Sequence, residues 1–280
     1  MDYRVDLYFA DVGNSRIRAV KSDTGVITTV AGGGTDEIGD GGPATLATFS
    51  SHPMRVALDK NGNMYVADAH QNRIRIIDTS NNINTLAGNG YPCCSGDGGK
   101  ATEASINSPH GISIDSSGNV FIADLKNHRV RKVSSNNGII TTVAGTGKAG
   151  IYGDGGLAQA AELNSPISVS LDKNENLYIT DHGNSCVRRV DSNSGRITTV
   201  AGIGKSGFLG DGKLATESAL NRPRDVSIYE TFKSFHDRIY SDIEINSVTP
   251  FTDRVVDRLT ATLMIAYART RLKSVSRYLN

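Results

Sequence analysis

The 280-residue sequence predicts an all-β fold built from one repeated unit, because its glycine content, short apolar runs and internal repetition agree. It contains 30 glycines and no tryptophan, and its apolar residues fall in short runs rich in β-branched side chains. Runs of this kind, punctuated by glycine, are typical of short strands joined by tight turns. A GDG triplet recurs every 57 residues, beginning at Gly39, Gly96, Gly153 and Gly210. A fixed period of this length defines the structural unit.

Each period holds four strand-like runs. In the second period they are RVALD (55–59), NMYVAD (63–68), RIRIID (73–78) and INTLAG (83–88). Apolar or β-branched residues alternate with others in each run, as expected of half-buried strands. Asn61-Gly62 lies between the first two runs and predicts a hairpin with a two-residue turn. Four antiparallel strands in every repeat, arranged radially, predict a β-propeller.

The ends of the repeat region suggest how the ring closes. The first repeat starts at its second run, LYFAD (7–11), while residues 222–228 repeat only the first run of a further period. We expect strand 225–228 to pair with residues 6–11, which gives four blades of four antiparallel strands and no open edge. The alternative is part of a six-bladed ring, whose exposed strand edges would need a partner chain.

The repeats resemble a known propeller family. The segments GNMYVADAHQNRIRIID (62–78) and GNVFIADLKNHRVRKV (118–133) resemble NHL repeats. The longer pattern that runs from GDGG to TVAG is similar to NHL-type repeats of bacterial surface proteins and of large animal adhesion receptors. The resemblance covers residues 4–228, so we expect a propeller domain at 1–229. It implies a binding scaffold, a subunit or a sensor module that presents loops to a protein partner.

The resemblance also leaves two other functions open. Some NHL-type proteins bind RNA, but 30 basic against 29 acidic residues provide no overall positive field for nucleic acid. Some NHL-like propellers are metal-dependent lyases or hydrolases, or bind small ligands at the channel mouth. No nucleophile–base motif and no set of metal ligands is recognisable, so we expect no enzyme, no catalytic residues, no metal and no cofactor.

The GDG turns are expected to be structural. A P-loop would continue with GK[ST] into a long helix, and a calcium loop would need more oxygen ligands. We expect the glycine after each aspartate to need a positive φ, and the aspartate to accept backbone N–H bonds and cap a short helix. The predicted turn residues are Asp40, Gly41, Asp97, Gly98, Asp154, Gly155, Asp211 and Gly212.

The best candidate binding site lies where the repeats differ. Positions beside the proline that opens each innermost run vary between copies, and in a propeller they lie at the mouth of the central channel. The predicted rim consists of His52, Arg55, His110, Arg222, Arg224 and Asp225. The alternative is that these residues are ordinary solvated loop ends. His52 and His110 alone are too few ligands for a catalytic zinc site.

Two further sets of side chains recur. An aspartate ends the second run of each repeat. Five residues later comes an arginine, replaced by Cys186 in the last repeat, and a second arginine follows two residues after that. We expect the aspartate and the arginines to pair within the blade. The loops before the GDG turns carry Tyr91, Tyr152 and Phe208, which form an interaction edge or each cover their own blade. Cys93, Cys94 and Cys186 suit free thiols.

Residues 230–280 are expected to form a helical extension. Apolar residues recur at helical spacing after Thr252, and Arg269, Arg271 and Lys273 crowd the end, which suits the helix dipole. The helix docks on the propeller or a partner, or lies on a membrane surface. No apolar run is long enough for a transmembrane helix. The N-terminus lacks a signal-peptide layout, so cytoplasm is the default expectation, although related repeats are often extracellular.

Overall fold

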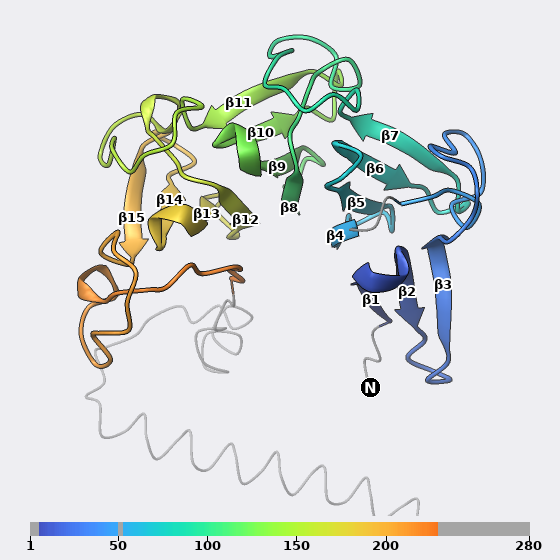
Figure 1. The fold of residues 1–280 in the computed structure, drawn as a ribbon, viewed down its shortest axis with the longest axis horizontal. Coiled ribbons are helices and arrows are strands. Elements are labelled where there is room, and N and C mark those ends of the chain that lie inside the picture. Colours follow the sequence, from blue (N-terminus) through green and yellow to red (C-terminus); the bar gives the residue numbers. More distant parts are fainter. Residues whose placement is uncertain (1–5, 50–52, 229–280) are drawn as a thin grey trace, which may run out of the picture. The chain divides into compact units, whose positions relative to one another are not determined.

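The computed structural model describes residues 6–49 and 53–228, which form four antiparallel sheets that follow one another in chain order (Figure 1). The first sheet holds three strands: β1 (Leu7–Asp11), β2 (Arg16–Val20) and β3 (Ile27–Gly32). The second holds β4 (Pro53–Leu58), β5 (Met64–Asp68), β6 (Arg73–Ile77) and β7 (Ile83–Ala87). The third holds β8 (Pro109–Ile114), β9 (Val120–Asp124), β10 (Arg129–Val133) and β11 (Ile140–Ala144). The fourth holds β12 (Pro166–Leu171), β13 (Leu177–Asp181), β14 (Cys186–Val190) and β15 (Ile197–Ala201).

These sheets confirm the predicted all-β propeller fold. In each four-stranded sheet every strand pairs with its sequence neighbour, and the strand bounds lie within two residues of the predicted runs. In the part of the chain that the structure describes, five short 3₁₀ helices lie outside the strands: η1 (Val12–Asn14), η2 (Leu125–Asn127), η3 (Ala158–Ala160), η4 (His182–Asn184) and η5 (Ala215–Glu217). The innermost strands β4, β8 and β12 contact one another in succession, and β1 contacts β4.

The hairpin between β4 and β5 differs from the sequence prediction, which gave it a two-residue turn. The backbone of Asp59 accepts a hydrogen bond from Gly62 and donates one to Asn63, so three residues form the loop. The Asp59 carboxylate also accepts backbone hydrogen bonds from Asn61 and Asn63, at 2.9 Å each. This local carboxylate–backbone bonding favours the longer loop, with Gly62 at φ 88° as its left-handed residue.

The core lies between the sheets. Three clusters of buried apolar side chains each combine residues from two successive sheets. The first packs Ile17 and Phe49 against Val66 of β5, and the next packs Ile74 against Ile122 of β9. Full burial of one such side chain contributes roughly 1.5–3 kcal/mol. Since each cluster needs both of its sheets, the contact between blades is the unit that stabilises this fold.

The predicted closure of the first blade is not formed. β1 pairs with β2, no described strand lies on its other edge, and residues 222–228 contain no strand. Leu7 at the start of β1 is 59% exposed, whereas its equivalents Met64, Val120 and Leu177 are at most 6% exposed. The side chain of Asp225 is instead held by two other innermost strands, as described below.

Some predictions fall on parts of the chain that lie outside the described residues. These are the helix expected after Thr252, with the whole 230–280 extension, and His52 of the predicted rim. Within 6–49 and 53–228, no helix has the length and apolar character required to cross a membrane.

Candidate functional site

The GDG turns have the backbone that the sequence predicts. The glycine after each aspartate has φ between 79° and 82°, which confirms the predicted positive φ at Gly41, Gly98, Gly155 and Gly212. The first glycine of each triplet also has a positive φ, a requirement that the sequence analysis missed. A Cβ at Gly96 would lie 2.6 Å from both Cα and Cβ of Ala104, while one at Gly98 would meet nothing within 4 Å.

Each described turn that is followed by a further sheet binds the outermost strand of that sheet. Gly98 donates a backbone hydrogen bond to Ile140 (2.8 Å), and Ile140 donates one to Gly99 (3.0 Å). Ala101 donates a third, to Gly138, at 2.9 Å. The turns thus tie each blade to the following one, which accounts for their recurrence without any bound phosphate or cation.

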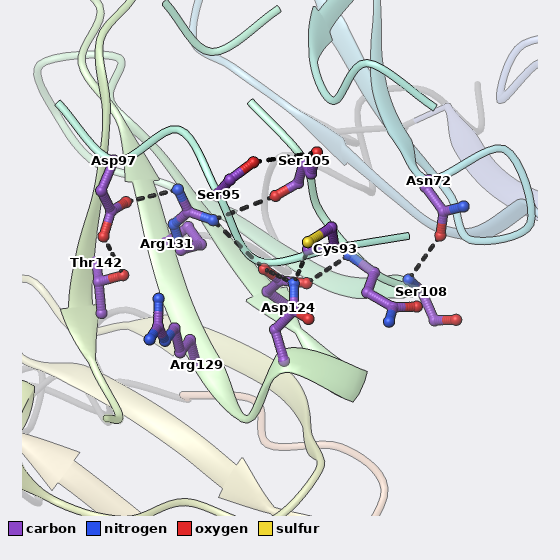
Figure 2. A network of polar contacts seen from close by, with 12 residues as sticks. Asn72, Cys93, Ser95, Asp97, Ser105, Ser108, Asp124, Arg129, Arg131 and Thr142 are labelled. Atoms are coloured by element: carbon purple, nitrogen blue, oxygen red, sulfur yellow. Dashed lines mark hydrogen bonds and ion pairs between the residues drawn. The ribbon is translucent and has the colours of Figure 1, made fainter. Parts of the chain in front are cut away.

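The aspartates of the turns have a different role from the predicted one. Asp97 binds Arg131 (2.5 Å) and the hydroxyl of Thr142 (2.6 Å), as Figure 2 shows. No side chain caps the short helices η3 and η5, which start after Leu157 and Leu214. The helix-capping role is therefore wrong. The carboxylate points across to the next blade because the buried guanidinium there needs a counter-ion.

In the second, third and fourth copies, the second arginine of the motif lies in a buried network. Arg131 is fully buried between Asp97 and Asp124, and its Nη1 also donates to the carbonyl of Ser105 (Figure 2). The same within-blade pair joins Arg188 to Asp181, at 3.5 Å. The predicted Asp–Arg pairing within a blade is therefore confirmed for this arginine. The fully buried members of the set are Arg75, Arg131 and Arg188, and their charges are enclosed rather than presented to a nucleic acid.

The strand-end aspartates are titratable groups inside this network. Burial raises the pKa of Asp124 to about 6, although hydrogen bonds from Asn107 and Asn127 and the charge of Arg131 lower it. Burial likewise raises the pKa of Asp181 to about 6, against the hydrogen bonds of Asn164 and Asn184. Both carboxyl groups lie beside a buried guanidinium, for which they are structural counter-ions.

The first arginine of each motif binds loop backbone instead of a carboxylate. Arg73 donates to the carbonyl of Asn89 (3.1 Å), and Arg129 donates to that of Thr146 (2.9 Å). Cys186 occupies this position in the last copy as a buried thiol, and burial raises its pKa to about 12. Cys93 and Cys94 are exposed free thiols.

The structure brings part of the predicted rim together. Arg55 of β4 and Asp225 form an ion pair at 2.5 Å, and the Ser168 hydroxyl of β12 donates to the same carboxylate at 2.5 Å. Gly111 of β8 abuts this group, since a Cβ there would lie 2.6 Å from Cα of Ser168. Burial acts to raise the pKa of Asp225, but the hydrogen bonds of Ser168 and Arg55 outweigh it and hold the pKa below its usual value.

These four residues occupy one repeat position, two residues after the opening proline. The sequence analysis chose Arg55 and Asp225 and left out Ser168 and Gly111, although their shared position was the signal that could have found them. His110 has its Nδ1 3.1 Å from the carbonyl of Ser108, and Arg222 and Arg224 are exposed. The described residues contain no group of three His, Cys, Asp or Glu side chains placed to hold a metal ion.

The loops that lead into the GDG turns present aromatic side chains to solvent. We call residues 88–96, 145–153 and 202–210 the aromatic loops. Tyr91, Tyr152 and Phe208 are 72%, 75% and 85% exposed. This exposure excludes one of the two predicted alternatives, namely that each aromatic side chain covers its own blade. Next to them, Leu209 is 73% exposed, so the third loop offers two adjacent apolar side chains.

The first two aromatic loops are held from both neighbouring blades. Besides the arginine of the preceding blade, an amide side chain of the following blade binds each loop: Asn127 donates to the carbonyl of Cys93, and Asn184 to that of Gly150, both at 2.6 Å. The sequence analysis missed these anchors. The signal was an amide residue three positions after every strand-end aspartate, at Asn14, Gln71, Asn127 and Asn184.

Comparison with known proteins agrees with this architecture. The family model described as the teneurin NHL domain matches residues 91–151, and the model of the NHL repeat matches residues 163–190. NHL repeat-containing protein 2 of Bos taurus is 27% identical over 254 residues, which cover 80% of this chain and 35% of that protein. Human teneurin-1 is 30% identical over 210 residues, which cover 65% of this chain and 7% of that protein.

A plant protein and a solved structure extend the comparison. The chloroplastic protein SUPPRESSOR OF QUENCHING 1 of Arabidopsis thaliana is 27% identical over 197 residues, covering 68% of this chain and 18% of that protein. The chain therefore spans well under two thirds of these relatives. A Bacteroides thetaiotaomicron protein of unknown function shares the fold, with a TM-score of 0.51, 18% identity, and coverage of 80% of this chain and 65% of that one. Residues 91–151 and 163–190 thus match NHL models, and the repeats of this chain are similar to those of NHL-repeat proteins.

Proposed function

We propose that this chain is a non-catalytic binding module that presents its aromatic loops to a protein partner. The observation that carries the proposal is the exposure of Tyr91, Tyr152 and Phe208, one aromatic side chain in each of three successive loops. Aromatic side chains are enriched at the energetic centres of protein interfaces, because they bury much area and lose little conformational entropy.

The anchoring of the loops supports binding by a preorganised surface. Arg73 and Asn127 hold the loop of Tyr91, and Arg129 and Asn184 hold the loop of Tyr152. In the third loop, the hydroxyl groups of Ser185 and Ser206 lie 2.9 Å apart. A partner that meets ordered loops pays less entropy on binding, so the same contact area gives a higher affinity.

The channel mouth favours this proposal over a small charged ligand at the centre. Arg55 and Asp225 neutralise each other there, and Ser168 already donates to the shared carboxylate. A charged ligand would have to displace one of these groups, whereas the aromatic loops have no such competing contact.

The test uses a photocrosslinking residue in the full chain. We expect p-benzoylphenylalanine at position 152 to form a covalent adduct with a partner protein in an extract of the source cells. The same residue at Leu58, which is 43% exposed at the far end of β4, is the matched control and should form no such adduct.

Competition then connects the adduct to the aromatic loops. An excess of unmodified chain should abolish it, while an excess of the Tyr91→Ser/Tyr152→Ser/Phe208→Ser variant should leave it. All three positions are exposed, so the variant is expected to fold, which circular dichroism checks. Equal competition by the variant, or the same adduct from position 58, would overturn the proposal.

A further inference from the structure

Two adjacent cysteines lie in the first aromatic loop, at positions where the repeats differ. Cys93 and Cys94 are both exposed free thiols. The other two aromatic loops, residues 145–153 and 202–210, contain no cysteine, and Gly150 and Ile151 occupy the equivalent positions in the first of them. The loop architecture therefore does not require the pair of thiols.

The carbonyl group between the two thiols is the point at which the following blade holds the loop. Asn127 donates to this carbonyl of Cys93 at 2.6 Å, and the same amide nitrogen donates to the buried carboxylate of Asp124 at 2.8 Å. Figure 2 shows Cys93 beside the network of Asp124 and Arg131. Asn127 is only 8% exposed, so this anchor is fixed in its blade and cannot follow a movement of the loop.

A disulfide between adjacent residues would constrain the peptide that joins them, because the bond closes a small ring that contains this peptide. Consecutive Cα atoms are about 3.8 Å apart across a trans peptide, whereas ordinary disulfides join Cα atoms about 4.4–6.8 Å apart. The ring is therefore strained, and strained, exposed disulfides are the ones most readily reduced again. It also restricts the directions in which the Cys93 carbonyl can point.

We propose that Cys93 and Cys94 form a reversible modification site, which a hydroperoxide oxidises to a disulfide between these two residues. One thiolate attacks a peroxide oxygen, the O–O bond breaks, and the remaining oxygen leaves as water or an alcohol. The second thiolate attacks the sulfur of the sulfenic acid so formed, the S–S bond forms, the S–O bond breaks, and water leaves. Each sulfur loses one electron and the peroxide gains both, while the two thiol protons end on the departing oxygens.

Ring closure turns the Cys93 carbonyl away from Asn127, so the loop loses its anchor on the following blade. Arg73 still holds the loop from the preceding blade through the carbonyl of Asn89, so the oxidised loop is looser but remains attached. Cys186 stays reduced, because it is buried and its raised pKa, about 12, keeps the thiol protonated. Any effect on a partner rests on the proposed function of the aromatic loops.

A thiol count on the full chain tests the modification. Stoichiometric hydrogen peroxide should remove two of the three free thiols, counted after unfolding, and dithiothreitol should restore them. The tryptic peptide of residues 76–100 should become lighter by two hydrogen atoms. Cys93→Ser and Cys94→Ser, which each keep one thiol of the pair, should show no such loss of mass. Unchanged thiols, disulfides between chains, or oxygen added to the sulfurs in place of the internal bond would overturn the proposal.

Hydrogen exchange tests the effect on the loop. The amides of residues 88–96 should exchange at least ~10-fold faster in the oxidised than in the reduced chain, whereas those of residues 145–153 should not change. Asn127→Ala lacks the anchor in both states, so its residues 88–96 should exchange rapidly whether reduced or oxidised. The matched variant Asn184→Ala loses the equivalent anchor of the next loop and should keep the difference at residues 88–96.

Two results would overturn the coupling between the disulfide and the anchor. These are equal exchange rates in the oxidised and reduced wild type, and a difference that persists in a folded Asn127→Ala chain. If Asn127→Ala does not fold, the comparison of the two wild-type states still decides. Neither experiment contains a partner protein, so its failure is distinct from failure of the proposed function.

Discussion

Two of the fully buried arginines among the described residues, Arg131 and Arg188, each bind two carboxylates from different blades. Arg131 takes Asp124 from its own blade and Asp97 from the preceding turn, and Arg188 takes Asp181 and Asp154 in the same way. Removing one partner from a buried ion pair is strongly destabilising, because the remaining charge loses its compensation. The charge of the buried arginine is therefore fully compensated only when the preceding turn is in contact with its blade.

The raised pKa of Asp181 gives a stability prediction with a definite sign. Its pKa is about 6 in the folded chain, above the value of about 3.9 in an unfolded one. Between these values the folded state binds a proton that the unfolded state does not, so this carboxyl contributes stability that grows as pH falls from 7 towards 4. Asp181→Asn should cost about 3 kcal/mol at pH 7 and more at pH 4.5, measured by urea unfolding.

Asp172 supplies the matched control with the opposite sign. Burial acts to raise its pKa, but hydrogen bonds from Asn174, Asn176 and Tyr178 outweigh it and lower the pKa. Its stabilising contribution is present above about pH 4 and is lost as pH falls through its folded pKa. The destabilisation by Asp172→Asn should therefore shrink at pH 3. A loss in Asp181→Asn that also shrinks on acidification would contradict the assigned pKa shift.

At the scale of the element, the two glycines of a GDG turn separate backbone strain from steric contact. Gly98→Ala puts a side chain at φ 82° into open space, which costs about 1–2 kcal/mol. Gly96→Ala meets the same kind of strain and adds a Cβ 2.6 Å from the backbone of Ala104. We expect Gly96→Ala to lose at least about 1 kcal/mol more than Gly98→Ala in urea unfolding.

Gly98→Asn completes this comparison, because asparagine tolerates the left-handed region better than alanine. It should recover part of the stability lost in Gly98→Ala, while Gly96→Asn should recover nothing. Equal losses in the two alanine variants would mean that contact with the loop at Ala104 contributes little and that φ alone decides.

The strands could be predicted from the sequence because their cause is local. Alternation of apolar residues marks β5 and β6 to within a residue at each end, and the repeat period places the copies. The partner of Asp97 could not be predicted, since it depends on which residue lies across the blade interface. Judged from its local sequence alone, Asp97 would cap a helix. In the folded chain it binds Arg131 instead, because that buried guanidinium requires a counter-ion.

In the candidate site, too, local features could be predicted from the sequence, whereas features that depend on tertiary packing could not. Comparing equivalent positions correctly brought Arg55 and Asp225 together, because repeats place equivalent residues around one channel. The aromatic loops could be seen in the sequence, but whether Tyr152 covers its blade or faces solvent depends on tertiary packing. Closure of the first blade failed as a prediction because sequence equivalence shows that a segment can form a strand, not where that strand pairs.

At the scale of the whole molecule, stability resides in the contacts between neighbouring blades. Every apolar cluster spans two sheets, and each of the three GDG turns that precede a further described sheet adds three backbone hydrogen bonds to it. A blade with two neighbours therefore gains from both sides, while the first sheet has its described contacts on one side only. Such quasi-linear arrays are least stable at their ends.

Hydrogen exchange tests whether local stability is lower in the first sheet than in the others. The equivalent strands β1, β5, β9 and β13 serve as internal controls. β5, β9 and β13 each pair on both edges, whereas β1 pairs only with β2 among the described strands. At low protein concentration, the β1 amides that face the open edge should exchange at least ~10-fold faster than their equivalents in β9. Protection of β1 equal to that of β9 in a dilute monomer would mean that a segment of the same chain completes the first blade in solution.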